Sequence, residues 1–343
     1  MLLHNRPLAP VFSSMQQKIR GFDMAVYVNT NYSALQGQRY LGNVQNSLTT
    51  TYQRLSSGMR INSAKDDAAG LQIADRLTSQ INGLNQGNRN ASDGIALAQT
   101  VEAGMDEISG MLQKIRTLAV QANNGTNTMD DKKALSKEAS ALATEVNRIA
   151  KQTTFAGKTV LNGYQTNSLV AKPAANAANG DAQSLTLQVG SNKGDVITFK
   201  LGNAIFSQIA KDAGIVANNG NIDDIIGAGA DKAFKKSANG DTMQVNFSVA
   251  DAPASIIEYM DKMIGHIDGM RADLGAIQNR LESSIRNQSN VAANEADARS
   301  RIRDADFAEE SANLSQQSII QQAAASMLMQ ANTRPQLGLS LLG

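Results

Sequence analysis

Few side chains in this 343-residue chain suit catalysis or metal binding. The only histidines are His4 and His266, and there is no cysteine. Because an HExxH motif needs two histidines on one helical turn, a zinc hydrolase site of that type is excluded. The absence of cysteine also excludes disulfides and thiolate metal sites. His266 stands next to Ile267 in a helical pattern, so we expect it at a surface or packing position.

Two acidic pairs remain as candidates for acid–base chemistry, Asp66-Asp67 and Asp304 with Asp306. Neighbouring carboxylates can act as general acid and base, but acids near helix starts also offset the helix dipole, and we prefer this structural interpretation. The run 227–229 is Gly-Ala-Gly, which lacks the third glycine of a dinucleotide-binding loop. The sequence therefore predicts no enzyme, no cofactor and no metal site.

Composition narrows the class of protein further. The net charge of +1 gives no electrostatic argument for binding nucleic acid or a membrane surface. No apolar run approaches the roughly 20 residues that span a bilayer, and residues 1–23 lack the uninterrupted apolar stretch of a cleaved signal peptide. Aromatic residues make up 4% and tryptophan is absent, which suits thin contacts between helices better than a large core.

The clearest pattern is an apolar repeat in steps of three and four near both ends of the chain. Such a repeat makes each helix bury one stripe against another helix. In residues 77–119 it continues through Ala91, Ile95, Ala98 and Met105. We expect a coiled-coil seam made of Leu48, Leu55, Leu77, Ile81, Leu84, Met263, Ile267, Met270, Leu274, Ile277 and Leu281.

Local signals place the helices of the N-terminal half. A first helix should end at Ser56-Ser57-Gly58, because glycine terminates helices. A long helix should cover residues 68–121. Thr128 with Asp131 forms a capping-box pattern that opens another helix to about residue 151.

In the second half the period changes. The alternation within 185–189 and the run 196–201 predict a β-hairpin, and residues 203–252 have the composition of a small, solvent-facing insertion. Ser255 with Glu258 looks like a capping box for a helix reaching about residue 298. A last helix should follow Asp306 and break at Pro335, since proline interrupts helices.

These elements predict a mainly α fold. The N- and C-terminal segments form a long antiparallel helical hairpin or coiled-coil bundle with a small β-rich middle. We expect an N-terminal extension (1–23), an inner coiled coil (24–57 and 301–343), a helical wall (58–163 and 253–300), a hairpin region (164–202) and a short variable outer insertion (203–252).

Several runs in this order resemble bacterial flagellins. The most specific is Ala298-Arg299-Ser300-Arg301-Ile302-Arg303-Asp304-Ala305-Asp306-Phe307. The others are residues 24–31, 54–70, 113–121, 154–158, 161–163 and 330–336. Together they cover about residues 24–163 and 254–343, most of the chain. Residues 1–23 precede the usual start of the family, so we expect a mis-assigned initiation site at Met1 and true initiation at Met24; the alternative is a real, disordered extension.

The resemblance implies a structural subunit that is exported unfolded and polymerises into the flagellar filament for motility. Its terminal segments would be disordered in the monomer and fold on assembly. Implied partners are other copies of the chain, a filament cap protein, an export chaperone and a hook-filament junction protein. The implied location is the extracellular filament, reached by the flagellar type III pathway. The alternatives are a hook-filament junction protein, another secreted coiled-coil scaffold, and an enzyme inserted between flagellin ends.

Some flagellins are also sensed by a host Toll-like receptor. By resemblance the contact positions here are Lys114, Arg116, Leu118 and Glu138. Lysine stands at 114 where strongly sensed members have arginine, and it lacks the planar fork of arginine, which predicts weakened recognition. The alternative is that Leu118 is a seam residue and that the other three are solvated.

Overall fold

The computed structural model describes residues 30–163, 167–169, 183–215, 234–236, 243–249 and 251–340. His4, the 227–229 glycines and the N-terminal extension lie outside these residues. The chain divides into two compact units, residues 1–74 with 300–343 and residues 75–299. Two long helices, α2 (Ala68–Ala122) and α5 (Ala252–Arg303), continue across the boundaries. Among the described helices none is long and apolar enough to cross a membrane.

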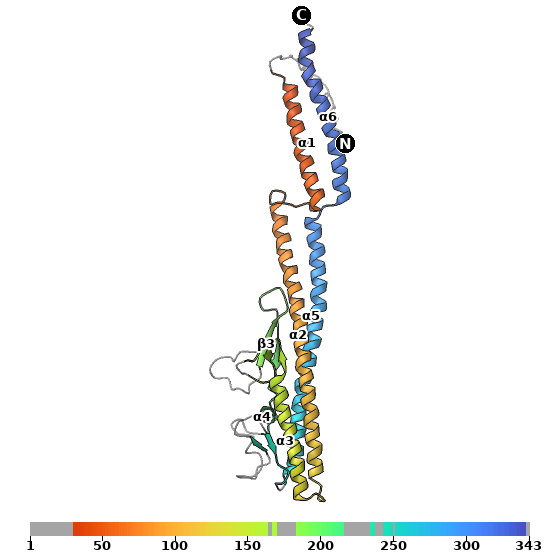
Figure 1. Ribbon diagram of the computed structural model, residues 1–343. Helices are drawn as coiled ribbons and strands as arrows, with labels where there is room; N and C mark the ends of the chain where they lie inside the picture. Colours follow the sequence, from red (N-terminus) through yellow and green to blue (C-terminus); the bar gives the residue numbers. More distant parts are fainter. Residues whose placement is uncertain are drawn as a thin grey trace, which may run out of the picture. The chain divides into compact units, whose positions relative to one another are not determined.

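The first unit pairs the two terminal helices, α1 (Tyr32–Ser57) and α6 (Phe307–Ser340). They lie side by side and run antiparallel (Figure 1), since Asn31 contacts Ala331 at one end and Arg54 contacts Glu310 at the other. Helix α1 ends where the sequence predicts. Gly58 adopts a left-handed φ of 69° and donates its N–H to the Arg54 carbonyl at 2.8 Å, a conformation that glycine adopts without steric cost.

The predicted break at Pro335 is wrong, because α6 continues through it to Ser340. Proline cannot donate to the carbonyl four residues earlier, which is that of Ala331. The Asn31 side-chain amide donates to this carbonyl instead, at 2.7 Å. The Asn31 Oδ1 atom also accepts from the backbone N–H of Ala34 at 3.1 Å. One side chain therefore caps α1 and satisfies the carbonyl that the proline leaves free.

In the second unit α2 and α5 pair antiparallel, as three side-chain contacts along their length show. Gln278 donates to Glu102 at 3.0 Å, the Arg271 guanidinium lies 3.0 Å from Asp106, and Asn88 donates to Ser289 at 3.3 Å. The predicted capping box at Ser255 is wrong. The helix α5 already begins at Ala252, and the Ser255 N–H donates to the Asp251 carbonyl at 3.2 Å. Its end at Arg303 is also later than expected.

Helix α3 (Met129–Gln152) confirms the other capping box: Asp131 N–H donates to Thr128 Oγ1, and Asp131 Oδ2 accepts the Thr128 N–H. The reciprocal bonds satisfy two amides that the first helical turn leaves without partners. The Thr128 hydroxyl also donates to Asp131 Oδ2 at 2.7 Å, and this bond is the main cause of a lowered pKa for the Asp131 carboxyl.

The strands are short and confined to the middle of the chain (Figure 1). Strands β1 (Thr154–Phe155) and β2 (Lys158–Thr159) pair antiparallel. The predicted hairpin is confirmed: β3 (Gln183–Gln188) pairs antiparallel with β4 (Val196–Leu201), with Leu185 opposite Phe199. Burial alternates along β4, so one face packs on the core. A third pair joins β5 (Phe234–Lys236) to β6 (Met243–Val245).

The hairpin approaches α2 closely because α2 carries glycine there. A Cβ added to Gly87 would lie 2.0 Å from the Val189 carbonyl oxygen, and one added to Gly94 would lie 2.4 Å from Leu187 Cδ1. The Asn90 side-chain amide donates to the Gln188 carbonyl at 2.9 Å. Backbone-to-helix contact of this kind needs a missing side chain.

The expectation that residues 203–252 face solvent is wrong for much of the described part. Residues 206–212 form an unpredicted helix, α4 (Phe206–Asp212), and Phe206, Phe234 and Phe247 are at most 2% exposed. The rings of Phe206 and Phe234 lie 5.9 Å apart. Burying each aromatic side chain contributes about 1.5–3 kcal/mol, so this segment belongs to the core of its unit.

Side chains of α3 hold the same segment in place by hydrogen bonds. The hydroxyls of Ser140 and Ser136 accept the backbone N–H groups of Val245 and Phe247, each at 2.8 Å. The two serines are one helical turn apart, which matches alternate N–H groups of an extended chain. The fold class predicted from sequence is confirmed: mainly helical, with paired terminal helices and a small strand-containing middle.

Candidate functional site

The carboxylates of Asp66 and Asp67, in the 59–67 connector between α1 and α2, accept hydrogen bonds from nearby backbone amides. The Asp66 Oδ2 atom accepts the backbone N–H groups of Ser63 at 2.9 Å and Asn62 at 3.0 Å. The Ser63 bond is the main cause of a lowered pKa for this carboxyl. Asp67 Oδ1 accepts the N–H of Gly70 at 2.9 Å at the start of α2. Each carboxylate satisfies backbone amides, the structural role preferred from the sequence.

The carboxylates of the second acidic pair, Asp304 and Asp306, also accept hydrogen bonds from groups close in sequence. Asp306 Oδ1 accepts the N–H of Ala308 at 2.8 Å and so caps α6, and Asp304 accepts the hydroxyl of Ser300 at 2.6 Å. His266 is half-buried on α5. Within the described residues no group of three or more acidic or histidine side chains is placed to hold a metal ion. Among the described residues, these carboxylates bind backbone N–H groups and a serine hydroxyl.

The predicted seam residues of the second unit lie mostly inside it. Exposure is 2% or less for Met263, Ile267, Leu274 and Leu281, and 8–9% for Ile81, Leu84 and Ile277. Leu77 and Met270 are half-buried. Met270 faces the end of the hairpin, since a Cβ on Gly202 would lie 2.0 Å from its sulfur. The packing joins helices to the strands rather than forming a two-helix seam alone.

The contact between α1 and α6, which we call the terminal seam, is much thinner. On α1 it follows the heptad positions Ala34, Gly37, Leu41, Val44, Leu48, Thr51 and Leu55, and on α6 Glu310, Leu314, Gln317, Gln321, Ala324, Leu328 and Ala331. Only five of these side chains are buried to 9% exposure or less: Val44, Leu48, Thr51, Ala324 and Glu310. Of the predicted seam residues here, Leu48 is buried and Leu55 is half-buried.

Two polar pairs occupy one end of the terminal seam. Arg54 Nη1 donates to Glu310 Oε1 at 3.1 Å, and the hydroxyl of Thr51 donates to Gln317 Oε1 at 3.2 Å. The Glu310 side chain is only 8% exposed, while that of Arg54 is 32% exposed. Neither pair was predicted from the sequence. Their signal is that Glu310 and Gln317 stand at heptad positions where apolar residues are usual.

Large apolar side chains remain exposed on α1 and α6 after the two helices have paired. Of the twelve large hydrophobic residues exposed in the described part of the chain, eight belong to these two helices. They are Tyr32, Leu35, Tyr40, Tyr52, Phe307, Ile319, Met327 and Met329. Exposed apolar surface concentrated in this way is typical of a surface that binds another protein.

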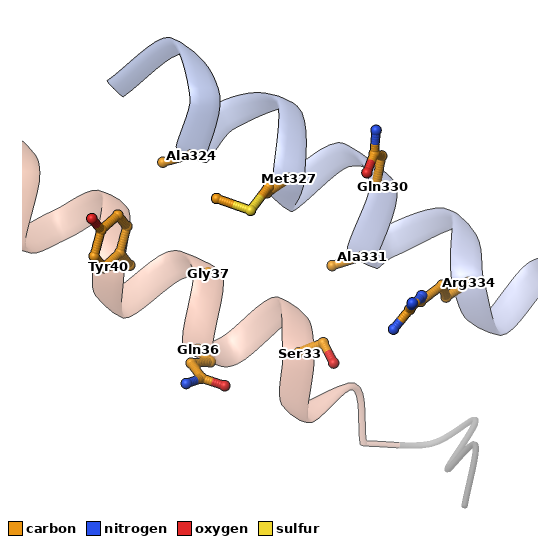
Figure 2. A pocket seen from close by; sticks show the side chains of 9 residues that line it. All are labelled: Ser33, Gln36, Gly37, Tyr40, Ala324, Met327, Gln330, Ala331 and Arg334. Carbon is orange, nitrogen blue, oxygen red and sulfur yellow. The ribbon is translucent and has the colours of Figure 1, made fainter. Parts of the chain in front are cut away.

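A groove of about 420 Å³ lies between the same helices (Figure 2). Figure 2 shows the Met327 side chain extending into the space between the helices, while Gly37 and Ala331 contribute no bulk. Its lining is completed by Ser33, Gln36, Tyr40, Ala324, Gln330 and Arg334. The groove is lined by apolar and neutral polar side chains and one arginine, a composition suited to a protein side chain rather than to a reaction.

The four receptor positions implied by resemblance have different environments. Lys114 and Glu138 are exposed, whereas Leu118 is 9% exposed and packs in the core. The Arg116 guanidinium donates two hydrogen bonds to the Asp261 carboxylate of α5, from Nε at 2.5 Å and from Nη2 at 3.2 Å. This partner raises the pKa of the guanidinium. The seam alternative therefore describes Leu118, and Arg116 has an intramolecular partner.

Comparison with known proteins agrees with this arrangement. The bacterial flagellin N-terminal helical region matches residues 28–166, and the bacterial flagellin C-terminal helical region matches residues 257–342. Polar flagellin C of Vibrio parahaemolyticus is 35% identical, and flagellin B of Vibrio cholerae is 36% identical, each over 93% of this chain and 100% of the relative.

Among solved structures, a protein described as flagellar hook-associated, from Vibrio parahaemolyticus, shares the fold. It matches with a TM-score of 0.50 and 15% identity, over 70% of this chain and 100% of that one. At this identity the match speaks for the fold alone. The two terminal regions and the identity to relatives along their whole length decide the family: this chain belongs to the bacterial flagellins.

Proposed function

We propose that this chain is the structural subunit of a bacterial flagellar filament and acts by self-assembly, without catalysis. The observation that carries the proposal is the exposed apolar surface on α1 and α6, which remains after the two helices have paired. In a homopolymer each such face meets a neighbouring copy. Family membership supports the same function.

The thin terminal seam supports coupling between folding and assembly. Ordering the backbone costs about 1–2 kcal/mol per residue, and α1 and α6 span 26 and 34 residues. Five buried side chains cannot offset a cost of that size. We infer that residues 25–55 and 307–342, of which 25–29 and 341–342 lie outside the described residues, are disordered in the monomer and fold against neighbouring copies.

Hydrogen exchange tests the coupling directly. In monomer the amides of α1 and α6 should exchange within seconds to minutes, while those of α2, α3 and α5 near the core remain protected. In polymer the terminal amides should become protected as well. Strong protection of the terminal helices in monomer would contradict the inference.

Electron microscopy of the purified protein after salting out tests the function itself. Long, regular filaments are expected, and a preparation that yields only monomers or irregular aggregates would contradict the proposal. A hook-filament junction protein shares such terminal helices but has no reason to form long filaments alone. The likeness to a hook-associated structure concerns the fold only, so it does not favour that alternative.

The location and further partners follow from the family. We propose export through the flagellar type III pathway to the extracellular filament, with a chaperone, a cap protein and a junction protein as partners. The absence of cysteine suits a chain that must stay unfolded during export. Loss of filaments at the cell surface on deletion of the export apparatus, with the chain retained inside, is the expected result.

We also propose an assignment of domains: residues 24–57 and 301–343 to the filament interior, and 58–163 and 253–300 to its wall. The two compact units support it in outline, since one of them joins the two chain ends. The structure differs from this assignment at the 59–67 connector, which lies in the unit of the chain ends. There Arg60 N–H donates to the Arg303 carbonyl at 2.7 Å and Ala305 N–H to the Gly58 carbonyl at 2.9 Å.

Recognition by a Toll-like receptor is proposed only for the exposed pair, Lys114 and Glu138. In a receptor-reporter assay on monomer, replacing either by alanine should lower potency. The same change at Lys133, whose partner is the neighbouring Asp130 at 3.0 Å, should not. Equal potency of all three variants would contradict the assignment.

A further inference from the structure

Between the Asn31–Ala331 hydrogen bond at one end and the polar pairs at the other, the terminal seam buries few apolar side chains that could fix its register: Val44, Leu48 and Ala324. Its α6 side repeats every seven residues, with small or polar residues at Gln317, Gln321, Ala324 and Ala331. A slip of one heptad moves α6 by about 10 Å along α1 and keeps the same stripe of α6 facing α1, with Ala324 in the place of Ala331 and Gln321 in the place of Leu328. Apolar packing is therefore a weak determinant of the register of these two helices.

The two polar pairs at the α1 C-terminal end behave differently. Glu310 accepts from Arg54, and Gln317, about two helical turns further along α6, accepts from Thr51. In the slip that brings Gln321 opposite Gly37, Glu310 would move from Arg54 to the level of Ser47. No cation stands there, and a buried carboxylate without a cation is strongly unfavourable.

The Arg54–Glu310 pair carries a cost of burial. Arg54 Nε and Glu310 Oε2 are buried and have no hydrogen-bond partner. Each unsatisfied group carries its own desolvation cost, and buried ion pairs are often no more stable than apolar residues of similar volume. A costly pair in an otherwise permissive seam is suited to selecting one alignment, as single polar residues do in coiled coils.

We propose that Thr51, Arg54, Glu310 and Gln317 form a register clamp that selects the alignment of α1 against α6 during assembly. These four are positioning residues: they select the alignment of the helices rather than hold them together. The inference rests on the proposed function, because the alignment of α1 against α6 is measured in the polymer.

The sequence permits a direct test, since it contains no cysteine. A Cβ on Gly37 would lie 3.9 Å from Leu328 Cβ, within the range that a disulfide bridges. The double variant Gly37→Cys/Leu328→Cys therefore reports the native register. The matched variant Gly37→Cys/Gln321→Cys reports a slip of one heptad.

Both reporters are placed in three full-length backgrounds. These are the natural clamp, an apolar clamp (Arg54→Met, Glu310→Met, Thr51→Val and Gln317→Leu) and a charge swap (Arg54→Glu with Glu310→Arg). Each protein is polymerised, oxidised and dissociated. Intrachain disulfides are then separated from interchain ones by non-reducing electrophoresis and identified by peptide mass spectrometry.

With the natural clamp the native disulfide should exceed the slipped one at least tenfold. The apolar clamp should lower this ratio tenfold or more, and the charge swap should restore it. A purely stabilising pair would change the total yield but not the ratio. An apolar clamp whose ratio stays within twofold of the natural one would overturn the proposal.

If the apolar clamp does not polymerise, the ratio is read in Glu310→Gln and in the charge swap. A lowered ratio in Glu310→Gln with a native ratio in the swap supports the clamp, and native ratios in both overturn it. Failure of the unmodified chain to form filaments contradicts the proposed function instead, so the two outcomes are distinguishable.

Discussion

Gly87 is the residue at which the docking of the β-hairpin on α2 can be tested most sharply. An alanine Cβ there would lie 2.0 Å from the Val189 carbonyl oxygen and 3.1 Å from Gln288 Oε1. The carbonyl belongs to the backbone, so it cannot rotate away as a flexible side chain does. The change Gly87→Ala must displace the hairpin from the helix by more than 1 Å, since ordinary contacts of this type exceed about 3 Å.

Two opposing contributions set the magnitude. Alanine gains up to about 1 kcal/mol over glycine in a helix interior, whereas overpacking a closely packed site costs about 1–3 kcal/mol and sometimes more. Because the obstacle here is backbone, the upper end applies, and Gly87→Ala should lower the free energy of unfolding by about 2 kcal/mol.

Gly110 provides the control in the same helix. Nothing lies within 4 Å of a Cβ added there, so Gly110→Ala should raise the free energy of unfolding by up to about 1 kcal/mol. Urea unfolding of monomer, followed by far-ultraviolet circular dichroism, measures both. If Gly87→Ala is as stable as Gly110→Ala, the hairpin does not rest on the helix backbone as described.

Three further changes separate roles that single side chains combine. Asn31→Asp keeps the acceptor that caps α1 but loses the donor to the carbonyl freed by Pro335, so its filaments should melt at a lower temperature than the natural ones. Asn31→Ala also loses the cap, which removes about 1 kcal/mol more of stabilising free energy, so its filaments should melt at a lower temperature still. Ser140→Ala removes the acceptor of the Val245 N–H and should speed hydrogen exchange of that amide roughly tenfold, for a loss of about 1.4 kcal/mol; unchanged exchange would contradict this. The pKa of Asp66 is lowered from 3.8, so its contribution to stability is present above that value and is lost as pH falls through the lowered one. The difference in unfolding free energy between the natural chain and Asp66→Asn should therefore be constant from neutral pH to about 5 and shrink below 4; a difference independent of pH would refute it.

Much of the helical architecture was predictable because its signals are local. Gly58 ends α1, and Thr128 with Asp131 opens α3, each through hydrogen bonds between residues close in sequence. The alternation in 185–201 likewise predicts the hairpin, whose register follows from its own side chains. A heptad repeat can be recognised in the sequence of one helix, without knowledge of its partner.

The errors arose where a distant residue changes the outcome of a local rule. Pro335 signals a break, but Asn31, far away in the chain, supplies the donor that the proline lacks. The composition of 203–252 indicates exposure, yet α3 accepts its backbone N–H groups and the core takes its phenylalanines. Neither compensation leaves a trace within a short window of sequence.

The sequence by itself determined which stretches form the long helices, where most of these begin and end, and to which family the chain is similar, because these depend on periodicity, capping and motif order along the chain. Only the tertiary structure decided how the helices meet: the glycines on which the hairpin rests, the enclosure of Leu118, and the pairing of Arg54 with Glu310. The physical reason is that a heptad stripe specifies that a helix has a partner, whereas the partner's alignment depends on polar and steric contacts between residues hundreds of positions apart.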